Sequence, residues 1–204
     1  PACFIRRENR FRAIVEMDGR LLAAHVSNSG RLGELFTPGA AVWVAPFADQ
    51  AGRKTACHLA LVAYAGVLVS VDARLPNRLV AEALAAGRLA PLAGYGRVQP
   101  EVRAGASRLD FLLSDGPDGK RCWLEVKSVT LVEDGRALFP DAPTTRGVRH
   151  LEELATLRRS GERVAVGFVV QRSDALRFRP HPTADPAFAA ALRCVYAEGV
   201  EVYA

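Results

Sequence analysis

Cysteine is scarce in this chain of 204 residues: there are four, and they stand far apart in the sequence. None belongs to a C-x-x-C pair, so the sequence predicts neither a disulfide framework nor a structural zinc site, and it favours a reducing compartment. There is no secretory signal pattern, and no apolar run approaches the about 20 residues that a membrane-spanning helix needs. We therefore expect a soluble, cytoplasmic protein that does not enter a membrane.

Several common functional motifs are absent as well. The sequence contains no glycine-rich phosphate loop, no H-E-x-x-H zinc motif and no G-x-S-x-G nucleophile elbow. It also shows no clear helix-turn-helix signal, which counts against sequence-specific reading of a major groove. Charge of one sign is only mildly in excess, with 27 basic and 22 acidic residues and a net charge of +5. That balance weakly favours a polyanionic partner.

The first 70 residues predict a small β-barrel. Short apolar runs occur in "ACFIRRENRFRAIVEMDGR", "LLAAHVSNSGR", "AAVWVAPF" and "ACHLALVAYAGVLVSVD", with turn-forming residues between them. The first of these stretches ends on Asp18-Gly19, a strong hairpin signal. Asn28 and Gly30 are expected to be turn residues with positive φ. Roughly five short strands favour an OB-like barrel over residues 1–70.

Residues 71–204 predict a mixed α/β domain. "LPNRLVAEALAAGRL" has a helical apolar face and begins with a proline near the helix start. A second helix is expected from the cap Thr144 to the stop Gly161, and a third begins at Asp185-Pro186. Between and after these helices lie apolar runs typical of strands, including "RVAVGFVV", which suits a strand buried on both faces. The predicted order is helix, three strands, helix, strand, helix, strand.

The stretch "SRLDFLLSDGPDGKRCWLEVKS" places charged residues inside two apolar strands. A hairpin centred between Pro117 and Asp118 puts Asp110 opposite Glu125 and Arg108 opposite Lys127. Opposed residues have Cβ atoms about 5 Å apart, and like charges there repel. On the second strand Glu125 and Lys127 share one face, while Leu124 and Val126 point to the other. Two carboxylates so close together require a compensating positive charge.

A divalent cation is the strongest candidate for that charge, because carboxylate oxygens are the hard ligands that Mg²⁺ and Mn²⁺ prefer. Asp110 and Glu125 would hold the cation, and Glu82 of the preceding helix could reach it through water. Lys127 would orient the attacking water or steady a phosphate, which suits hydrolysis of a phosphodiester. The alternative is an ordinary amphipathic hairpin with Glu-x-Lys on a solvated face.

This succession of elements around Asp110, Glu125 and Lys127 resembles the PD-(D/E)xK nuclease superfamily, although Leu109 stands where the proline of its name would be. The whole chain is similar to the sugar fermentation stimulation protein family, which is described as DNA-binding. The matching blocks, in order, are "HVSNSGRLGEL", "LPNRLVAEAL", "SRLDFLL", "LEVKSVTLV", "FPDAPTTRGVRHLEEL" and "DPAFAAAL...GVEVYA". The resemblance implies an N-terminal OB-like domain followed by a PD-(D/E)xK-like domain over residues 71–204.

Further residues are candidates for the same site or for contact with nucleic acid. Glu101 could be another metal ligand or a surface acid, and the carbonyl of Val126 could complete the metal site. Asp141 and His150 lie in the most specific family block and could line the cleft, although a hydrogen-bonded structural role is common for such a histidine. Basic residues placed to contact phosphates are Arg6, Arg7, Arg10, Arg12, Arg108 and Arg146. Phe4 and Phe11 lie among the first of these and point either to the core or to bound bases.

Two functions remain open on the sequence. The first is a DNA-binding protein with a Mg²⁺- or Mn²⁺-dependent nuclease site. The second is a non-catalytic DNA-binding protein that regulates transcription of sugar-utilisation genes, with the acids as a relic or a structural ion site. RNA or a nucleotide is a weaker alternative substrate. Strand preference and oligomeric state are left undetermined.

Overall fold

The computed structural model describes residues 1–48, 52–116 and 119–204. The chain forms two compact units. The first comprises Pro1–Leu75, Thr130–Asp141 and Val170–Arg179, and the second comprises Pro76–Val129, Ala142–Val169 and Pro180–Ala204. The sequence predicted one continuous second domain from residue 71, whereas two segments of that stretch group with the first unit. No helix within the described ranges is long and apolar enough to cross a membrane.

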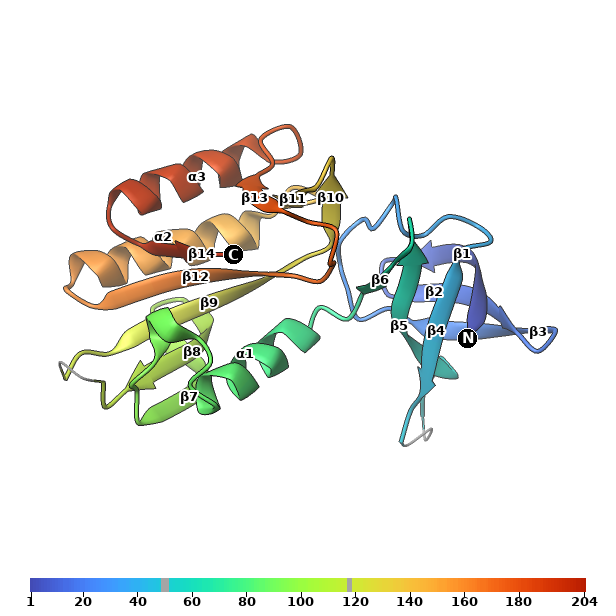
Figure 1. Ribbon diagram of the computed structural model, residues 1–204, viewed down its shortest axis with the longest axis horizontal. Helices are drawn as coiled ribbons and strands as arrows, with labels where there is room; N and C mark the ends of the chain where they lie inside the picture. The colour runs from blue at the N-terminus through green and yellow to red at the C-terminus, as the bar shows by residue number, and fades with distance from the viewer. Residues whose placement is uncertain (49–51, 117–118) are drawn as a thin grey trace. The chain divides into compact units, whose positions relative to one another are not determined.

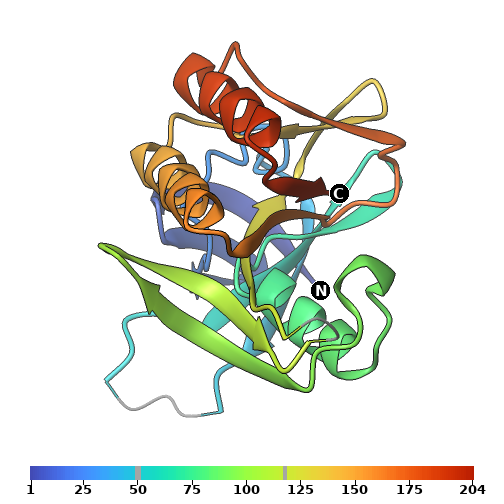
Figure 2. The same ribbon diagram turned by 90° about the vertical axis from the view of Figure 1, so that its left-hand side faces the viewer.

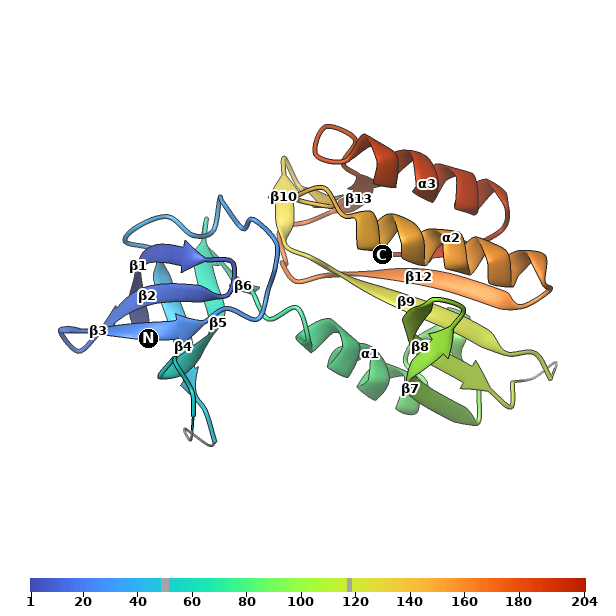
Figure 3. The same cartoon turned by 180° about the vertical axis from the view of Figure 1, so that it is seen from behind.

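A closed β-barrel forms most of the first unit (Figures 1 and 3). Its strands are β1 (Ala2–Asn9), β2 (Arg12–Met17), β3 (Arg20–His25), β4 (Ala41–Pro46), β5 (Cys57–Tyr64) and β6 (Val67–Ser70). They hydrogen-bond in the order β3-β2-β1-β4-β5-β6, and pairing of β3 with β5 closes a five-stranded ring. Val15 of β2, Ala24 of β3 and Leu59 of β5 are fully buried in its core. The predicted OB-like barrel is confirmed.

The predicted hairpin turn joins β2 to β3. Met17 pairs with Arg20 across the turn. Asp18 and Gly19 both have positive φ, 52° and 72°, as a two-residue type I′ turn requires.

Gly30 allows a close approach between two segments of the first unit. The backbone N–H of Gly30 donates to the side-chain oxygen of Asn28 at 2.8 Å, and the N–H of Leu32 donates to Asp141 at 3.2 Å. A Cβ on Gly30 would stand 2.6 Å from Oδ2 of Asp141. The prediction of positive φ for Asn28 and Gly30 was wrong, since neither has it. The glycine is needed for space rather than for a left-handed backbone.

Replacing Gly30 with alanine is therefore expected to lower the free energy of unfolding by about 1 to 3 kcal/mol, the usual cost of overpacking. Gly33 in the same loop is the matched control, because a Cβ there meets nothing within 4 Å and its φ is not positive. Gly33→Ala should be neutral or stabilise by up to about 1 kcal/mol. Chemical denaturation measures both, and equal effects would contradict the role of Asp141 at Gly30.

The second unit is a five-stranded sheet between helices (Figures 1 and 2). Its elements are α1 (Leu75–Ala85), the 3-10 turn η1 (Ala90–Leu92), β7 (Arg97–Ala104), β8 (Ser107–Ser114), β9 (Cys122–Val129), α2 (Thr145–Arg159), β12 (Arg163–Val170), α3 (Pro186–Ala197) and β14 (Glu201–Tyr203). The strand order is β14-β12-β9-β8-β7. Val80 of α1 packs with Phe111, Leu124 and Val126 on one face, and α2 and α3 cover the other. This is the mixed α/β fold that was predicted.

Both predicted helix caps are confirmed. Thr144 accepts a hydrogen bond from Gly147 N at 3.0 Å, and Asp185 accepts one from Phe188 N at 2.9 Å. The second oxygen of Asp185 accepts from Thr144 N at 2.8 Å. One buried carboxylate thus joins the first turns of α2 and α3 and fixes where α2 begins.

A third, small sheet was not predicted. It consists of β10 (Leu131–Glu133), β11 (Arg136–Phe139) and β13 (Arg177–Pro180), in that order. Arg172, beside this sheet in the sequence, is buried. Its guanidinium pairs with Asp174 at 2.6 Å, donates to Thr130 O at 3.3 Å and lies 4.9 Å from the centre of the Tyr64 ring of β5. These contacts explain why the two inserted segments belong to the first unit.

Candidate metal-binding active site

The pairing of β8 with β9 brings the two predicted acids together. Phe111 pairs with Leu124, and Leu112 and Leu113 continue the ladder on residues 123 and 122. That is the predicted register. The predicted hairpin midpoint between residues 117 and 118 lies outside the described residues. Asp110 and Glu125 are the next residues beyond the last of these pairs, where the two strands stop pairing.

Both carboxylate oxygens of Asp110 accept a hydrogen bond. Oδ2 accepts from the backbone N–H of Val126 at 2.7 Å, and Oδ1 accepts from the side-chain amide of Asn77 in α1 at 2.7 Å. Burial, together with the negative charge of Glu125, raises the pKa of Asp110 to about 6. Burying the charge of Asp110 therefore costs free energy, and a nearby cation would offset that cost.

Glu125 is almost fully buried and shares one oxygen between two donors. Its Oε1 contacts Nζ of Lys127 and Nδ1 of His150 from α2. Burial alone would raise the pKa of Glu125, but the hydrogen bond from His150 and the charge of Lys127 lower it below its ordinary value. Glu125 is thus held as a carboxylate.

The hydrogen bonds of His150 are consistent with one tautomer. Arg146, one turn earlier on α2, donates its Nε–H to Nε2 of His150 at 3.3 Å. A nitrogen that accepts carries no proton, so the proton of a neutral ring lies on Nδ1 and points to Glu125. His150, which was predicted either to line the cleft or to be structural, is buried and restrains the rotamer of Glu125. Arg146 is exposed and reaches the same network.

The second oxygen of Glu125 is the feature that makes this a metal-site candidate. Oε2 is buried and has no hydrogen-bond partner among the described residues. An unpaired buried carboxylate oxygen is costly. Because Glu125 is close enough for its charge to act on Asp110, the two carboxylates together offer hard oxygen donors. The residues present therefore fit a divalent cation. The described part of the chain contains no group of three or more His, Cys, Asp or Glu side chains placed to hold a metal ion. Further ligands would therefore be water, backbone or substrate oxygens, as Mg²⁺ commonly uses.

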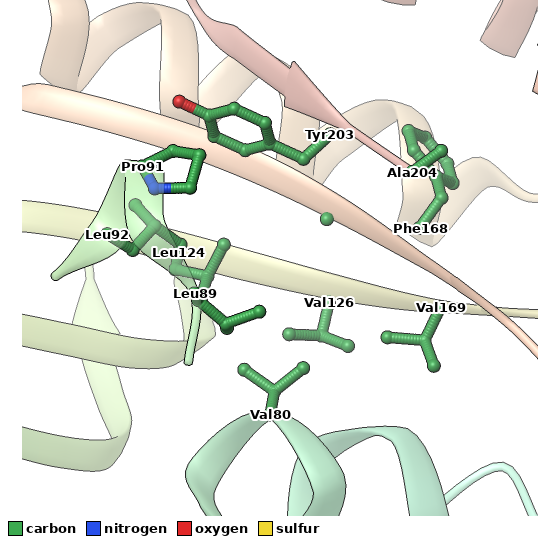
Figure 4. A pocket seen from close by; sticks show the side chains of 11 residues that line it. Val80, Leu89, Pro91, Leu92, Leu124, Val126, Phe168, Val169, Tyr203 and Ala204 are labelled. Carbon is green, nitrogen blue, oxygen red and sulfur yellow. The ribbon is translucent and has the colours of Figure 1, made fainter. Parts of the chain in front are cut away.

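An apolar cavity lies on the α1 side of β9 (Figure 4). Its volume is about 330 Å³, and Val80, Leu124, Val126 and Phe168 are among the side chains around it. No charged side chain of the described residues lines it. The side chains around the cavity therefore supply no charged ligand to a metal or a phosphate.

Two family models together match almost the whole chain. One, described as the SfsA N-terminal OB domain, matches residues 5–71, and the other, described as the Sugar fermentation stimulation protein RE domain, matches residues 74–204. The chain belongs to the sugar fermentation stimulation protein family. The resemblance noted from the sequence is confirmed.

Relatives within the family are similar over the full length of this chain. The homolog from Moorella thermoacetica is 50% identical over 203 residues, which cover 100% of this chain and 87% of the relative. The homolog from Chloroflexus aurantiacus is also 50% identical over 203 residues, with 100% and 77% covered. The solved structure of Pyrococcus furiosus SfsA in complex with Ca²⁺ matches with a TM-score of 0.90 at 33% identity, covering 98% of this chain and 85% of that chain.

Several residues predicted for the site are not brought to it in this family member. Glu82 is exposed and lies about 140° around α1 from Asn77. Glu101 and Arg108 are both exposed, and their side chains are 3.8 Å apart on the surface. Asp141 belongs to the first unit, where it binds the backbone near Gly30.

Asn77 is the site residue that sequence reasoning missed. It lies in the block "LPNRLVAEAL" and occupies the first turn of α1. A signal was available, because Asn77 is three residues before Val80 and so shares the buried face of that helix. Glu82 was predicted instead because it carries a carboxylate, but it lies on the exposed face of α1.

The arginines of the barrel that were predicted to contact phosphates differ in how far their guanidinium groups are already bound within the protein. Arg7 donates to the backbone carbonyls of Asn9, Arg10, Asn28, Gly30 and Arg31. The structure therefore gives Arg7 a structural role, and its guanidinium is not free for a nucleic acid. Arg6 is exposed and Arg12 is partly exposed, and both pair with Glu8. Arg10 is exposed.

Proposed function

We propose that the protein is a divalent-metal-dependent phosphodiesterase that acts on DNA. The observation that carries this proposal is the buried pair Asp110 and Glu125, in which Oε2 of Glu125 has no partner among the described residues and Lys127 lies beside it. Buried carboxylate oxygens usually have a hydrogen-bond partner, and a bound cation would take that place here. The match to an RE domain supports the same conclusion.

The proposed cation is Mg²⁺ or Mn²⁺, held by Asp110, Glu125 and the carbonyl of Val126. A family member solved in complex with Ca²⁺ supports a divalent cation, and Ca²⁺ is an ion that takes oxygen ligands. When bound, such an ion would supply Lewis acidity, lowering the pKa of water and offsetting phosphate charge.

The chain's own residues would perform the other tasks. Asn77 and the N–H of Val126 hold Asp110 in place, and His150 holds Glu125. Lys127 is close enough to Glu125 to neutralise it and, with a side chain 12% exposed, can reach a phosphate oxygen or a water. Pre-oriented charge of this kind is the main contribution that a protein makes to phosphodiester hydrolysis.

Nucleic acid is the proposed partner of both units. The OB domain, the net charge of +5 and the RE domain description support it. A non-catalytic DNA-binding regulator is the alternative. It would retain DNA binding and show no metal-dependent cutting.

Cleavage of DNA in Mn²⁺, followed on gels, tests the proposal. Glu125→Gln keeps the shape of the side chain and removes its charge, and we expect cutting to fall at least about 100-fold. Glu82→Gln is the matched control and should cut like the unmodified protein, because Glu82 is exposed on another face of α1. Equal cutting by Glu125→Gln would indicate a contaminating nuclease or a different site. Bound but intact DNA with every protein would support the regulator.

A further inference from the structure

A row of four rings crosses the outside of the barrel where β3 and β5 meet. The rings are Phe11, His25, His58 and Phe47, called the aromatic row below. His25 and His58 are direct partners in the parallel pairing that closes the barrel, and adjacent strands lie about 4.8 Å apart. Ala24 and Cys57, the preceding pair, are buried, so strand alternation turns the two histidines outward.

The two phenylalanines extend the row at both ends. Phe11 stacks on His25 with ring centres 6.5 Å apart, and its side chain is 49% exposed. Phe47 lies 5.9 Å from His58. A half-exposed phenylalanine gives up favourable burial, and its flat face is available to another ring.

Cations accompany the aromatic row. The guanidinium of Arg53 lies 4.0 Å over the Phe47 ring. Arg12 is opposite His25 on β2 and donates to Lys54 O at 3.3 Å, and the side chain of Lys54 is exposed. The acid Glu8 pairs with Arg12. The surroundings of the row are therefore mainly basic.

The position of the row is the one that an OB barrel uses for oligonucleotides: the face of β2 and β3 and the connections β1–β2 and β4–β5. Phe11 lies in the first connection, and Phe47, Arg53 and Lys54 lie in the second. Only described residues enter this reasoning, and residues 49–51 play no part in it.

We propose that the aromatic row binds a single-stranded polynucleotide by stacking one base on Phe11 and one on the pair of Phe47 and Arg53, with Arg12 and Lys54 along the phosphates. Stacking on a ring requires an exposed base face, which a duplex does not offer. It is also tolerant of sequence, because each base has such a face. This proposal concerns the first unit and stands whether or not the acid pair cuts DNA.

Fluorescence anisotropy with labelled oligo(dT), oligo(U) and a duplex, each about 15 nucleotides long, tests the proposal. The measurements use the Glu125→Gln background in EDTA, so that cleavage cannot contribute. We expect single strands to bind at least about 10-fold more tightly than the duplex. Phe11→Ala and Phe47→Ala should each weaken single-strand binding by roughly 5- to 150-fold, the range for one lost stack. The oligo(dT) and oligo(U) arms distinguish DNA from RNA as the source of the strand.

Two control variants distinguish a loss of binding from a loss of folding. Phe11→Trp retains a stacking ring and should bind at least as well as the unmodified protein. Leu21→Ala removes an apolar side chain of β3 that is 63% exposed and outside the row, and should not change binding. Unchanged affinity in both phenylalanine-to-alanine variants, failure of the unmodified protein to bind single strands, or equal affinity for the duplex would each overturn the proposal.

Discussion

Asp110→Asn is expected to stabilise the metal-free protein and to abolish its response to Mn²⁺. The pKa of Asp110 is about 6 in the fold, against about 3.9 in an unfolded chain. At pH 7 the carboxyl is ionised in both states, so its raised pKa means that its charge opposes folding by up to about 3 kcal/mol. The hydrogen bond lost with one oxygen costs about 1 kcal/mol. The net expected gain in free energy of unfolding is about 1 to 2 kcal/mol.

In saturating Mn²⁺ the unmodified protein should become more stable than Asp110→Asn. A cation that binds only the folded state stabilises it by about 2.7 kcal/mol at 100 times its dissociation constant. The unmodified protein would show that rise in a thermal or denaturant melt, and the variant would not. A variant that is less stable without metal, or that still responds to it, would contradict the placement of the cation at Asp110.

Lys127→Met is expected to lower DNA cleavage by about 100- to 1,000-fold, as loss of one oriented donor does elsewhere. Metal affinity should stay the same or increase, because a positive charge that competes for Oε1 of Glu125 is removed. Mn²⁺ titration and single-turnover cleavage measure the two effects separately.

Lys120→Met is the control for this change. Lys120 is exposed in the same unit, and removing its charge should leave both quantities within about two-fold of the unmodified protein. Loss of metal binding together with cleavage in Lys127→Met would mean that Lys127 supports the fold of the site. Unchanged cleavage would remove Lys127 from the chemistry.

The acid pair could be predicted because its determinants are local. A strand period of two and a short loop fix which residues of β8 and β9 meet, and the observed pairs follow that register. The helix caps at Thr144 and Asp185 were predictable for the same reason, since a cap depends on residues within one turn.

The partners of the acid pair depend on tertiary packing and could not be read in the same way. Asn77 and His150 reach the site only because α1 and α2 lie on opposite faces of the sheet. The number of residues that separates Asn77 or His150 from the two acids does not determine how close they lie in the fold. The structural role of Arg7 was not predicted for the same reason, because three of the five carbonyls that it binds, those of Asn28, Gly30 and Arg31, lie more than twenty residues later in the sequence.

The unpredicted sheet had a local signal that was overlooked. "LVEDGRALF" carries Asp134-Gly135 between apolar residues, the same hairpin signal as Asp18-Gly19. Both residues have positive φ, and Glu133 pairs with Arg136 across the turn. The third strand, β13, has no such turn and is placed only by long-range pairing.

The central claim is that Asp110 and Glu125 hold one divalent cation. Anomalous diffraction from crystals grown with Mn²⁺ tests it most directly. We predict one strong peak in contact with Asp110 and with Oε2 of Glu125, absent from crystals of Glu125→Gln. A peak elsewhere, or no peak beside these two carboxylates in crystals of the unmodified protein, would contradict it.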